Sequence, residues 1–474
     1  MRKAKILLIV WVVAVLAFTL AILPSCKTTT TTETTAAAET TAAAAEITAA
    51  EIKDKGPLKF WIQDYSFGQT NEMKAVLDEL AADFKSKTGI TVEYSIIPWQ
   101  EALQKHMLAI QGGEAPDVMD EFYLKSRVDL GMGKYGPIPL NDYIIKKFGS
   151  IKKFQEKFFE SAYTNPDSFL NGIYYSVPWR IDVRFFAARS DLIEKAGLEV
   201  KLPATMVEFL DYAQKLTIDK NNDGIIDQYG VAVGYAKGEG VWRGMLPVLY
   251  SAGSNIISSE DNWTKTDINT PEVIEHLQFW RDLVAKYKVI APDVLSPAYN
   301  GSDELLSGRG VMDISTNTGM IQAMQKEIPN LPLIGGPMYQ GPVNRNNFGA
   351  IASFAVYQQS KHIEAALEWL WYLTEDENAA KLTAVCGVMT PNIGVANTDP
   401  RYKEDWALKA SAAQMEAGLS PGDPPAQNWA KIAGWEEGDP LFTLMYSVLD
   451  PNGGPIKELV KTAEAQIVEL LKVK

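Results

Sequence analysis

The chain has 474 residues, 59 acidic and 45 basic side chains, and a formal net charge of −14. This excess of acids disfavours nucleic acid and anionic lipid surfaces as partners, because both are negatively charged. The cysteines are Cys26 and Cys386, which excludes a disulfide framework.

The N-terminal segment has the pattern of an export signal. Arg2, Lys3 and Lys5 precede an apolar run that ends at Leu23-Pro-Ser-Cys26. Leu, a small residue and Cys in this order resemble the bacterial lipobox. The resemblance implies a signal peptide over residues 1–25 and lipidation of Cys26, which would become the mature N-terminus. An uncleaved membrane anchor is the alternative, since the run approaches transmembrane length.

Residues 26–55 are mainly Thr, Ala and Glu and contain no aromatic side chain. Such a composition buries too little apolar surface to fold alone, so we predict a tether. A tether between a lipid anchor and a folded body indicates work at the outer surface of a membrane. Cleavage would remove three basic residues and no acids, and the net charge would become −17.

The body begins with strand-like and helical runs in alternation. This order predicts a parallel α/β sheet, in which ligands collect beyond the carboxyl ends of the strands. Strands are expected at 58–62, 90–97 and 116–119, and helices at 71–87 and 100–111. The loops after these strands carry Asp64, Tyr65, Trp99, Asp120 and Glu121.

The stretch 172–198 contains two strand-like runs, at 173–177 and 183–188. Pro178 is expected to interrupt the first, and a short helix from Ser190 to Gly197 follows the second. This stretch fits a passage between two domains, and it fits a kinked buried strand equally well. Further strands are expected at 231–235, 310–314 and 348–357, and the C-terminal tail is expected to be helical at 402–418, 429–433 and 441–471.

Seven short motifs in register between residues 58 and 391 resemble the bacterial extracellular solute-binding proteins of the carbohydrate type, the receptors of ABC importers. The motifs are Gly89-Ile-Thr-Val92, Gly113-Glu-Ala-Pro-Asp-Val118, Gly172-Ile-Tyr-Tyr-Ser-Val-Pro178, Arg189 to Leu198, Asp219-Lys-Asn-Asn-Asp-Gly224, Gly308-Arg-Gly-Val-Met312 and Ser360-Lys-His-Ile-Glu-Ala-Ala366.

The resemblance implies an α/β, two-lobed fold of the type II periplasmic-binding-protein kind, with a ligand cleft between the lobes. The N-terminal lobe would comprise residues 56–180 and 338–386, and the C-terminal lobe residues 181–337 and 387–474. The chain would cross between them three times, near 179–184, 335–340 and 386–392. Closure about such crossings is a hinge motion.

Candidate ligand-binding residues follow from the loops that this family directs at its ligand. Aromatic rings stack on the apolar faces of sugars, and carboxylate, amide and guanidinium groups bind their hydroxyls. For each of these residues, packing in the core or an ion pair between the lobes is the competing interpretation. The candidates are Asp64, Tyr65, Trp99, Asp120, Glu121, Trp179, Arg180, Asp182, Trp242, Asn317, Arg345 and Trp435.

The stretch from Asp219 to Asp227 resembles the first nine positions of a calcium-binding loop, with Asp219, Asn221, Asp223 and Asp227 as possible ligands. Its twelfth position is Gly230 where a bidentate Glu is required, so a turn capped by Asx side chains is favoured. We predict no metal and no other cofactor.

No enzyme motif stands out. His106, His276 and His362 have no partner at metal-ligand spacing, and prolines follow the Gly131-x-Gly133-x-x-Gly136 run, so no helix opens there to hold a pyrophosphate. The resemblance therefore implies a monomeric, lipid-anchored receptor for a carbohydrate, in particular an oligosaccharide, which serves an ABC importer at the outer face of the cytoplasmic membrane, in the periplasm or at the cell surface. The alternatives are the same fold with a polyol, glycerol-phosphate or peptide ligand, and a surface glycoside hydrolase with two carboxyl groups flanking the bond.

Overall fold

The computed structural model describes residues 52, 56–66, 68–121, 134–166, 168–233, 241–258, 263–420, 424, 426, 428–434 and 438–472. The predicted signal peptide, Cys26 and Trp435 lie outside these residues, as does all of the predicted tether except Ile52. Among the described residues, no helix is both long and apolar enough to span a bilayer.

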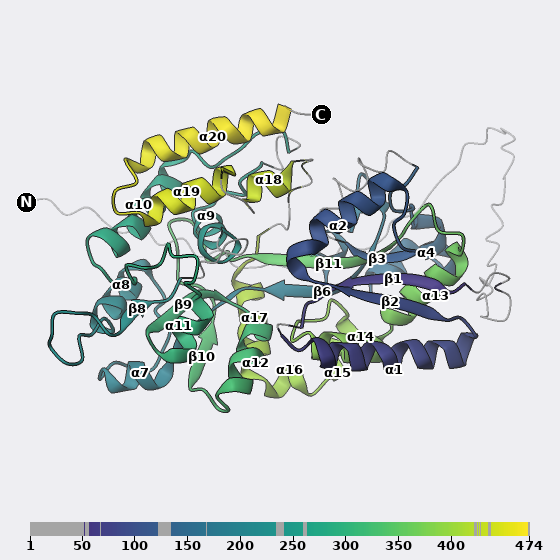
Figure 1. Cartoon of the computed structure of the whole chain (residues 1–474), viewed down its shortest axis with the longest axis horizontal. Helices are drawn as coiled ribbons and strands as arrows, with labels where there is room; N and C mark the ends of the chain where they lie inside the picture. The colour runs from purple at the N-terminus through teal and green to yellow at the C-terminus, as the bar shows by residue number, and fades with distance from the viewer. Residues whose placement is uncertain are drawn as a thin grey trace, which may run out of the picture. The chain divides into compact units, whose positions relative to one another are not determined.

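The first sheet has the strand order β2-β1-β3-β11-β6 (Figure 1). The predicted parallel start is confirmed, because β1 pairs parallel with β2 and with β3. β11 is antiparallel to β3 and to β6. The strands are β1 Leu58–Gln63, β2 Val92–Ile97, β3 Val118–Glu121, β6 Val177–Val183 and β11 Gly349–Val356.

Helices cover this sheet with their apolar faces. In α1, residues Met73, Leu77, Leu80 and Phe84 are buried at helical spacing, and Gly89 ends the helix in the left-handed conformation at φ 78°. These side chains pack into the first core with residues of the later helices. The helices around this core are α1 Thr70–Thr88, α2 Trp99–Gly112, α4 Asn141–Phe148, α5 Ile151–Gln155, α6 Glu160–Tyr163, α13 Ile363–Leu373 and α14 Asp376–Val385.

The second sheet has the order β10-β7-β9-β8, and its core is larger. Its strands are β7 Phe185–Arg189, β8 Tyr229–Val231, β9 Gly310–Thr316 and β10 Leu333–Gly336, and a short hairpin of β4 Phe169–Leu170 and β5 Ile173–Tyr174 stands apart. The helices of this part are α7 Ser190–Lys195, α8 Met206–Lys215, a π-helix Val241–Met245, α9 Leu246–Ser251, α10 Pro271–Ala285, α11 Gly301–Ser307 and α12 Thr318–Glu327.

The helical tail is confirmed, and most of it belongs to the second core. Arg281 of α10 holds the end of α19, because its side chain donates to the carbonyl oxygens of Val448 at 2.7 Å and Gly454 at 3.1 Å. The tail helices are α15 Ile393–Thr398, α16 Arg401–Glu404, α17 Trp406–Ala417, α18 Trp429–Ala433, α19 Pro440–Leu449 and α20 Ile456–Lys472.

The expected break at Pro178 is wrong, because β6 runs through it. β6 lies at the edge of the first sheet, where a missing N–H does not interrupt a ladder on both sides. The register with β11 shifts here: Pro178 and Arg180 face Ser353 and Ala352, so Trp179 is an extra, bulged residue. β6 then passes into β7 of the second sheet after Val183.

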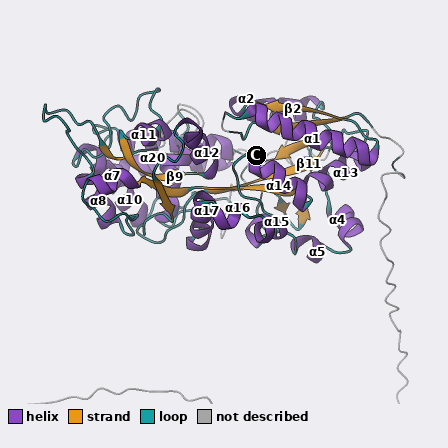
Figure 2. Cartoon of the chain, turned by 90° about the horizontal axis from the view of Figure 1, so that it is seen from below, coloured by secondary structure: helices purple, strands orange, loops and turns teal. Residues whose placement is uncertain are grey.

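The chain returns from β10 to β11 through residues 337–348. Gln340 is still bonded to the region around the second sheet, since its N–H donates to Ala204 O at 2.8 Å. Gln414 of α17 braces this return: its side chain accepts from Met338 N at 2.7 Å and donates to Arg345 O at 2.9 Å. In Figure 2, α17 lies between the elements of the two sheets, and its residues also contact β6, β7 and β10.

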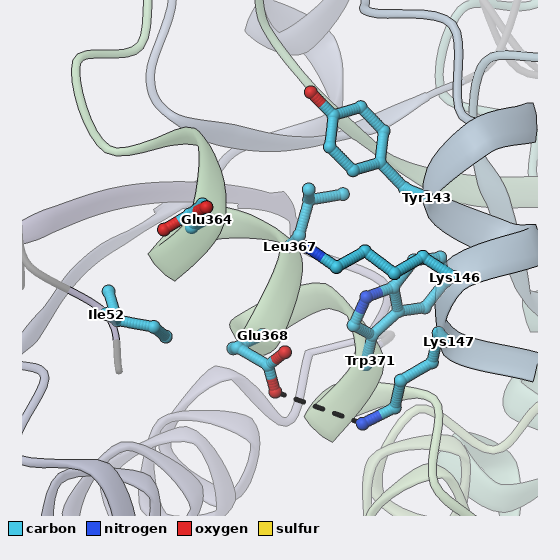
Figure 3. Close-up of a pocket in the computed structure, with 8 residues that line it drawn as sticks. All are labelled: Ile52, Tyr143, Lys146, Lys147, Glu364, Leu367, Glu368 and Trp371. Atoms are coloured by element: carbon cyan, nitrogen blue, oxygen red, sulfur yellow. Dashed lines mark ion pairs between the residues drawn. The ribbon is translucent and has the colours of Figure 1, made fainter. Parts of the chain in front are cut away.

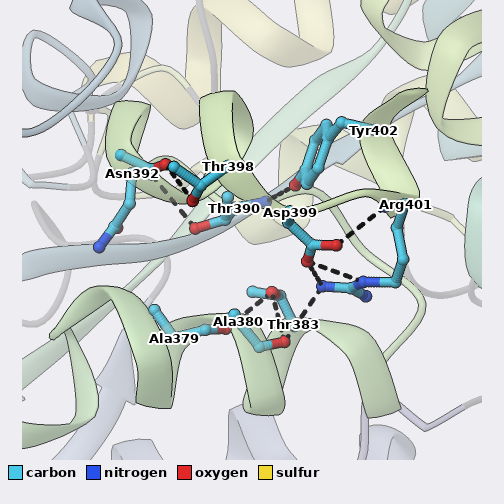
Figure 4. Close-up of polar contacts among 10 residues, drawn as sticks. Ala379, Ala380, Thr383, Thr390, Asn392, Thr398, Asp399, Arg401 and Tyr402 are labelled. Carbon is cyan, nitrogen blue, oxygen red and sulfur yellow. Dashed lines mark hydrogen bonds and ion pairs between the residues drawn. The ribbon is translucent and has the colours of Figure 1, made fainter.

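After α14 the chain stays with the first sheet for several residues. Met389 exchanges backbone hydrogen bonds with Ile181 at 2.8 and 3.2 Å. Tyr402 accepts from Thr390 N at 2.7 Å, and Arg401 donates to Ala380 O at 3.2 Å (Figure 4). The predicted lobe boundaries, including the one at 386/387, stay a prediction.

Gly230 in β8 lies against the backbone of α8. A methyl group there would overlap the carbonyl group of Ala213, which is backbone and cannot rotate away. We expect Gly230→Ala to lower the free energy of unfolding by about 1–3 kcal/mol in urea denaturation. The matched control is Gly112→Ala in the last turn of α2, where no atom lies within 4 Å. The control should be neutral or slightly stabilising, and equal losses in both variants would contradict the contact.

A buried hydrogen-bond chain connects α10 with the second core. His276 contacts Val248 O through Nδ1 and the Tyr339 hydroxyl through Nε2, both at 3.0 Å, and Trp280 Nε1 donates to the same hydroxyl at 3.2 Å. The neutral imidazole therefore donates to Val248 and accepts from Tyr339. Burial lowers the pKa of His276 to about 4.

This depressed pKa makes stability depend on pH. Between pH 6.5 and about 4 the unfolded state binds a proton at His276 that the folded state does not, so stability is lost as the pH falls through this window. Compared with His276→Gln, the wild-type chain should lose up to about 3 kcal/mol more unfolding free energy between pH 7 and pH 4. Urea denaturation at several pH values measures this difference, and a constant difference would show that His276 does not titrate in this way.

Candidate ligand-binding site

Tyr65 lies just after β1 and connects several of the predicted residues. Its hydroxyl contacts Asp120 Oδ2 at 2.7 Å and also the amide oxygen of Gln63. Its ring contacts Trp99 and Trp179 edge to face, with centroids 5.5 and 5.6 Å apart. Side chains from the carboxyl ends of β1, β2 and β3 thus lie in one cluster around Tyr65.

The Tyr65 hydroxyl remains protonated. Burial, followed by the negative charge of Asp120, raises its pKa well above the ordinary value, and Arg180 opposes this shift. A tyrosine hydroxyl has one proton, so if it donates to Asp120 it must accept from Gln63. In the present orientation of the Gln63 amide, Nε2 has no hydrogen-bond partner among the described residues. Turning the amide over would let Nε2 donate to the Tyr65 hydroxyl while that hydroxyl donates to Asp120.

Arg180 is a buried, positively charged side chain of this cluster. It is 5% exposed, and its guanidinium carbon lies 3.7 Å from the centroid of the Tyr65 ring. Within the described ranges no carboxylate forms an ion pair with Arg180, and its Nε has no hydrogen-bond partner. A buried N–H without an acceptor is costly, so the Nε of Arg180 is a donor that a ligand or water could satisfy.

Trp179 has a different environment from the one expected of a sugar platform. Its ring stacks on Phe354 with centroids 5.0 Å apart and planes at 9°, and the residue is only 1% exposed. No face of the indole is therefore open in this conformation. Trp99, at the first turn of α2, is partly exposed and is the better placed of the two.

Asp182 and Asn317 lie against each other across the passage from β6 to β7. Asp182 accepts from Asn317 Nδ2 at 2.9 Å and from Arg184 Nη2 at 3.2 Å, and all three residues are buried. Asn317 is also the N-cap of α12, where its Oδ1 accepts from Met320 N at 2.8 Å. These two candidates thus use their polar atoms on one another and on α12.

Arg180 and two nearby carboxylates all affect the pKa of one buried thiol, that of Cys386. Burial raises the pKa of Cys386 to about 12, and the charges of Arg180, Asp64 and Asp120 all act on this thiol. Asp64 itself accepts from Ser66 N at 3.0 Å and from the hydroxyls of Ser66 and Thr70. Asp64 therefore belongs to the same neighbourhood as Arg180 and Asp120.

Comparison with known proteins decides the family. Residues 68–380 match the family model described as bacterial extracellular solute-binding protein. The chain belongs to this family. A candidate binding protein of Brucella abortus is 25% identical over 433 residues, which cover 90% of this chain and 96% of the relative.

Solved structures confirm the two-lobed fold of the solute-binding proteins. A substrate-binding protein of Listeria monocytogenes in complex with cycloalternan matches with a TM-score of 0.70 and 20% identity, over 89% of this chain and 100% of that one. A solute-binding protein of Agrobacterium radiobacter in complex with ribitol matches with a TM-score of 0.68 and 20% identity, over 87% and 98%.

The remaining candidate ligand-binding residues of this solute-binding protein do not join the cluster around Tyr65 among the described residues. Arg345 donates from Nε to Met338 O at 2.6 Å and holds the return segment, and its burial lowers its pKa. Trp242 lies in the π-helix and Glu121 ends β3, but their side chains are not among those described. Trp435 lies outside the described residues, and the ligand-binding role of every candidate stays a prediction.

A buried ion pair that the sequence did not indicate lies next to Trp242. Arg243 Nη2 contacts Asp313 Oδ2 at 2.8 Å, and the two side chains are 3% and 1% exposed. Asp313 also accepts from Ser315 N at 2.9 Å. The pair joins the π-helix to β9, and π-helical turns are frequent at functional sites. Sequence periodicity contains no signal for such a turn.

The loop from Asp219 to Asp227 carries side-chain to backbone hydrogen bonds. Gly224 N donates to Asp219 at 2.8 Å, Ile225 N to Asp223 at 2.8 Å, and Lys220 N to Asp227 at 2.7 Å. Asn221 accepts from Asp223 N at 3.0 Å. The bonds of Asn221 and Asp223 reach two residues on and are Asx turns, whereas those of Asp219 and Asp227 connect more distant parts of the loop. Which interpretation of the loop holds stays a prediction.

The Tyr65 hydroxyl should contribute measurably to stability. We expect Tyr65→Phe to lower the unfolding free energy by about 1–3 kcal/mol in urea denaturation, because Asp120 and Gln63 are buried and lose a partner. Tyr94→Phe is the matched control, since its hydroxyl bonds the exposed Asp78, and it should cost less than about 1 kcal/mol. A larger loss in the control would contradict this role of Tyr65.

Proposed function

We propose that this protein is a lipid-anchored receptor that binds a carbohydrate, in particular an oligosaccharide, between its two lobes and delivers it to an ABC importer. The observation that carries the proposal is Arg180. Its buried guanidinium has no anionic partner among the described residues and lies on an aromatic ring beside Asp120 and Asp64. Guanidinium and carboxylate groups next to aromatic rings are the combination that sugar hydroxyls and C–H faces require.

The structural relatives support the same class of ligand. The Listeria protein was solved with cycloalternan and the Agrobacterium protein with ribitol. A polyol is therefore the second candidate, with glycerol-phosphate and peptide after it. The lipid anchor rests on Leu23 to Cys26, and the importer on the family to which the chain belongs.

Thermal unfolding and calorimetric titration with a panel of ligands test the proposal. The panel consists of maltotriose, cellotriose, diacetylchitobiose, ribitol and glycerol-phosphate, each added to the purified full chain. At least one saccharide should bind and raise the Tm, since a ligand at 100 times its Kd stabilises by about 2.7 kcal/mol. Stabilisation by ribitol or glycerol-phosphate alone would overturn the sugar assignment, and release of shorter sugars would favour the hydrolase.

The variant Arg180→Met should weaken binding of the saccharide so identified by about 10- to 100-fold, which is what loss of a charged hydrogen bond amounts to. Lys286→Met is the matched control, because Lys286 also places its cation over a tyrosine ring. Its Nζ lies 4.7 Å from the centroid of the Tyr287 ring, just after α10. The control should bind normally. An unchanged Kd in Arg180→Met would remove Arg180 from the site.

A further inference from the structure

A small groove lies between α4 and α13, two helices that pack around the first core. Its volume is about 50 Å³, which is room for a few water molecules or an aliphatic side chain. Tyr143, Lys146 and Lys147 of α4 line one side, and α13 lines the other (Figure 3). Lys147 and Glu368 join the two helices at 4.0 Å.

Ile52 occupies one side of this groove, next to Glu364 and Glu368 of α13 (Figure 3). The residue is 3% exposed and belongs to the first core together with Leu367 and Trp371. Ile52 precedes β1, so its burial is not a consequence of being part of the sheet. Its side chain lies beside α13 and lines the groove that α4 closes on the other side.

The composition of the N-terminal segment makes this contact specific. Between Lys27 and Lys55, Ile47 and Ile52 are the only large apolar residues; the rest are Thr, Ala, Glu, Lys and Asp. Ile52 is flanked in sequence by Glu51 and Lys53. The groove itself has lysines on α4 and glutamates on α13 around its apolar residues Leu367 and Trp371.

We propose that the groove between α4 and α13 is the docking site of the chain's own tether, with Ile52 as the side chain that fastens it. Among Thr, Ala and Glu, an isoleucine offers the larger apolar side chain for such docking. The docked residue fixes the point at which the N-terminal segment leaves the folded body, on the α4–α13 face.

This docking has a consequence for the receptor, which rests on the proposed lipidation of Cys26. The acylated end is then separated from the body by the 26 peptide steps from Cys26 to Ile52, at most roughly 90 Å when fully extended.

Limited trypsin digestion of the full chain tests the docking, with cleavage after Lys53 and Lys55 followed by mass spectrometry. A protease needs several extended residues around the bond it cuts, and a fastened Ile52 withholds them. Ile52→Ser should therefore be cut at these lysines at least 10-fold faster than the wild-type chain. Ile47→Ser, the same substitution five residues earlier, should be cut at the wild-type rate.

Equal rates in the wild-type chain and Ile52→Ser would overturn the docking. An equal acceleration in Ile47→Ser would also overturn it, because the effect would then not belong to Ile52. The digestion uses neither ligand nor lipid, so its failure is distinct from failure of the proposed function. Titration of Ile52→Ser with the saccharide that binds the wild-type chain should give an unchanged Kd, and altered binding would contradict a role confined to the tether.

Discussion

One extended stretch, Val177 to Arg189, belongs to both sheets, and the arrangement of the candidate site depends on its backbone hydrogen bonds. Ile181 pairs with Ile351 of β11 on one side and exchanges bonds with Met389 on the other. Three residues later, Arg184 N donates to Phe348 O at 2.9 Å. Beyond the bulge, alternation along the strand puts Arg180, Asp182 and Arg184 on one face. The strand thus delivers three charged side chains to the place where the sheets meet.

These three side chains have different roles because their surroundings differ. Arg184 and Asp182 neutralise one another, and Asp182 also holds the N-cap residue of α12. A buried pair of this kind costs desolvation on both members and helps mainly by fixing geometry. Arg180 forms no such ion pair among the described residues, and its guanidinium lies over the face of the Tyr65 ring. The ion pair and the N-cap contact orient the elements around them, whereas the Nε of Arg180 has no acceptor among the described residues.

The sequence was most informative where the signal is local. The spacing of Met73, Leu77, Leu80 and Phe84 predicted α1, and the helical tail was predicted in the same way. Trp179 shows what local patterns omit: its burial depends on Phe354, which lies 175 positions away in the chain. The passage through Pro178 depends on β6 being an edge strand, and the Arg243–Asp313 pair depends on a π-helical turn. Each of these is set by tertiary pairing, for which one sequence contains no direct signal.

The charge distribution also bears on the class of ligand. Asp64 and Asp120 accept hydrogen bonds from neutral hydroxyls, and both carboxyl groups act on the same thiol as Arg180. A phosphate would meet one guanidinium together with two carboxylates, and the repulsion would offset much of the attraction. A neutral saccharide has hydroxyls that both donate and accept, and so can satisfy Arg180 without adding charge. The charges around Tyr65 therefore support the proposal of a neutral, hydroxyl-rich ligand rather than an anionic one.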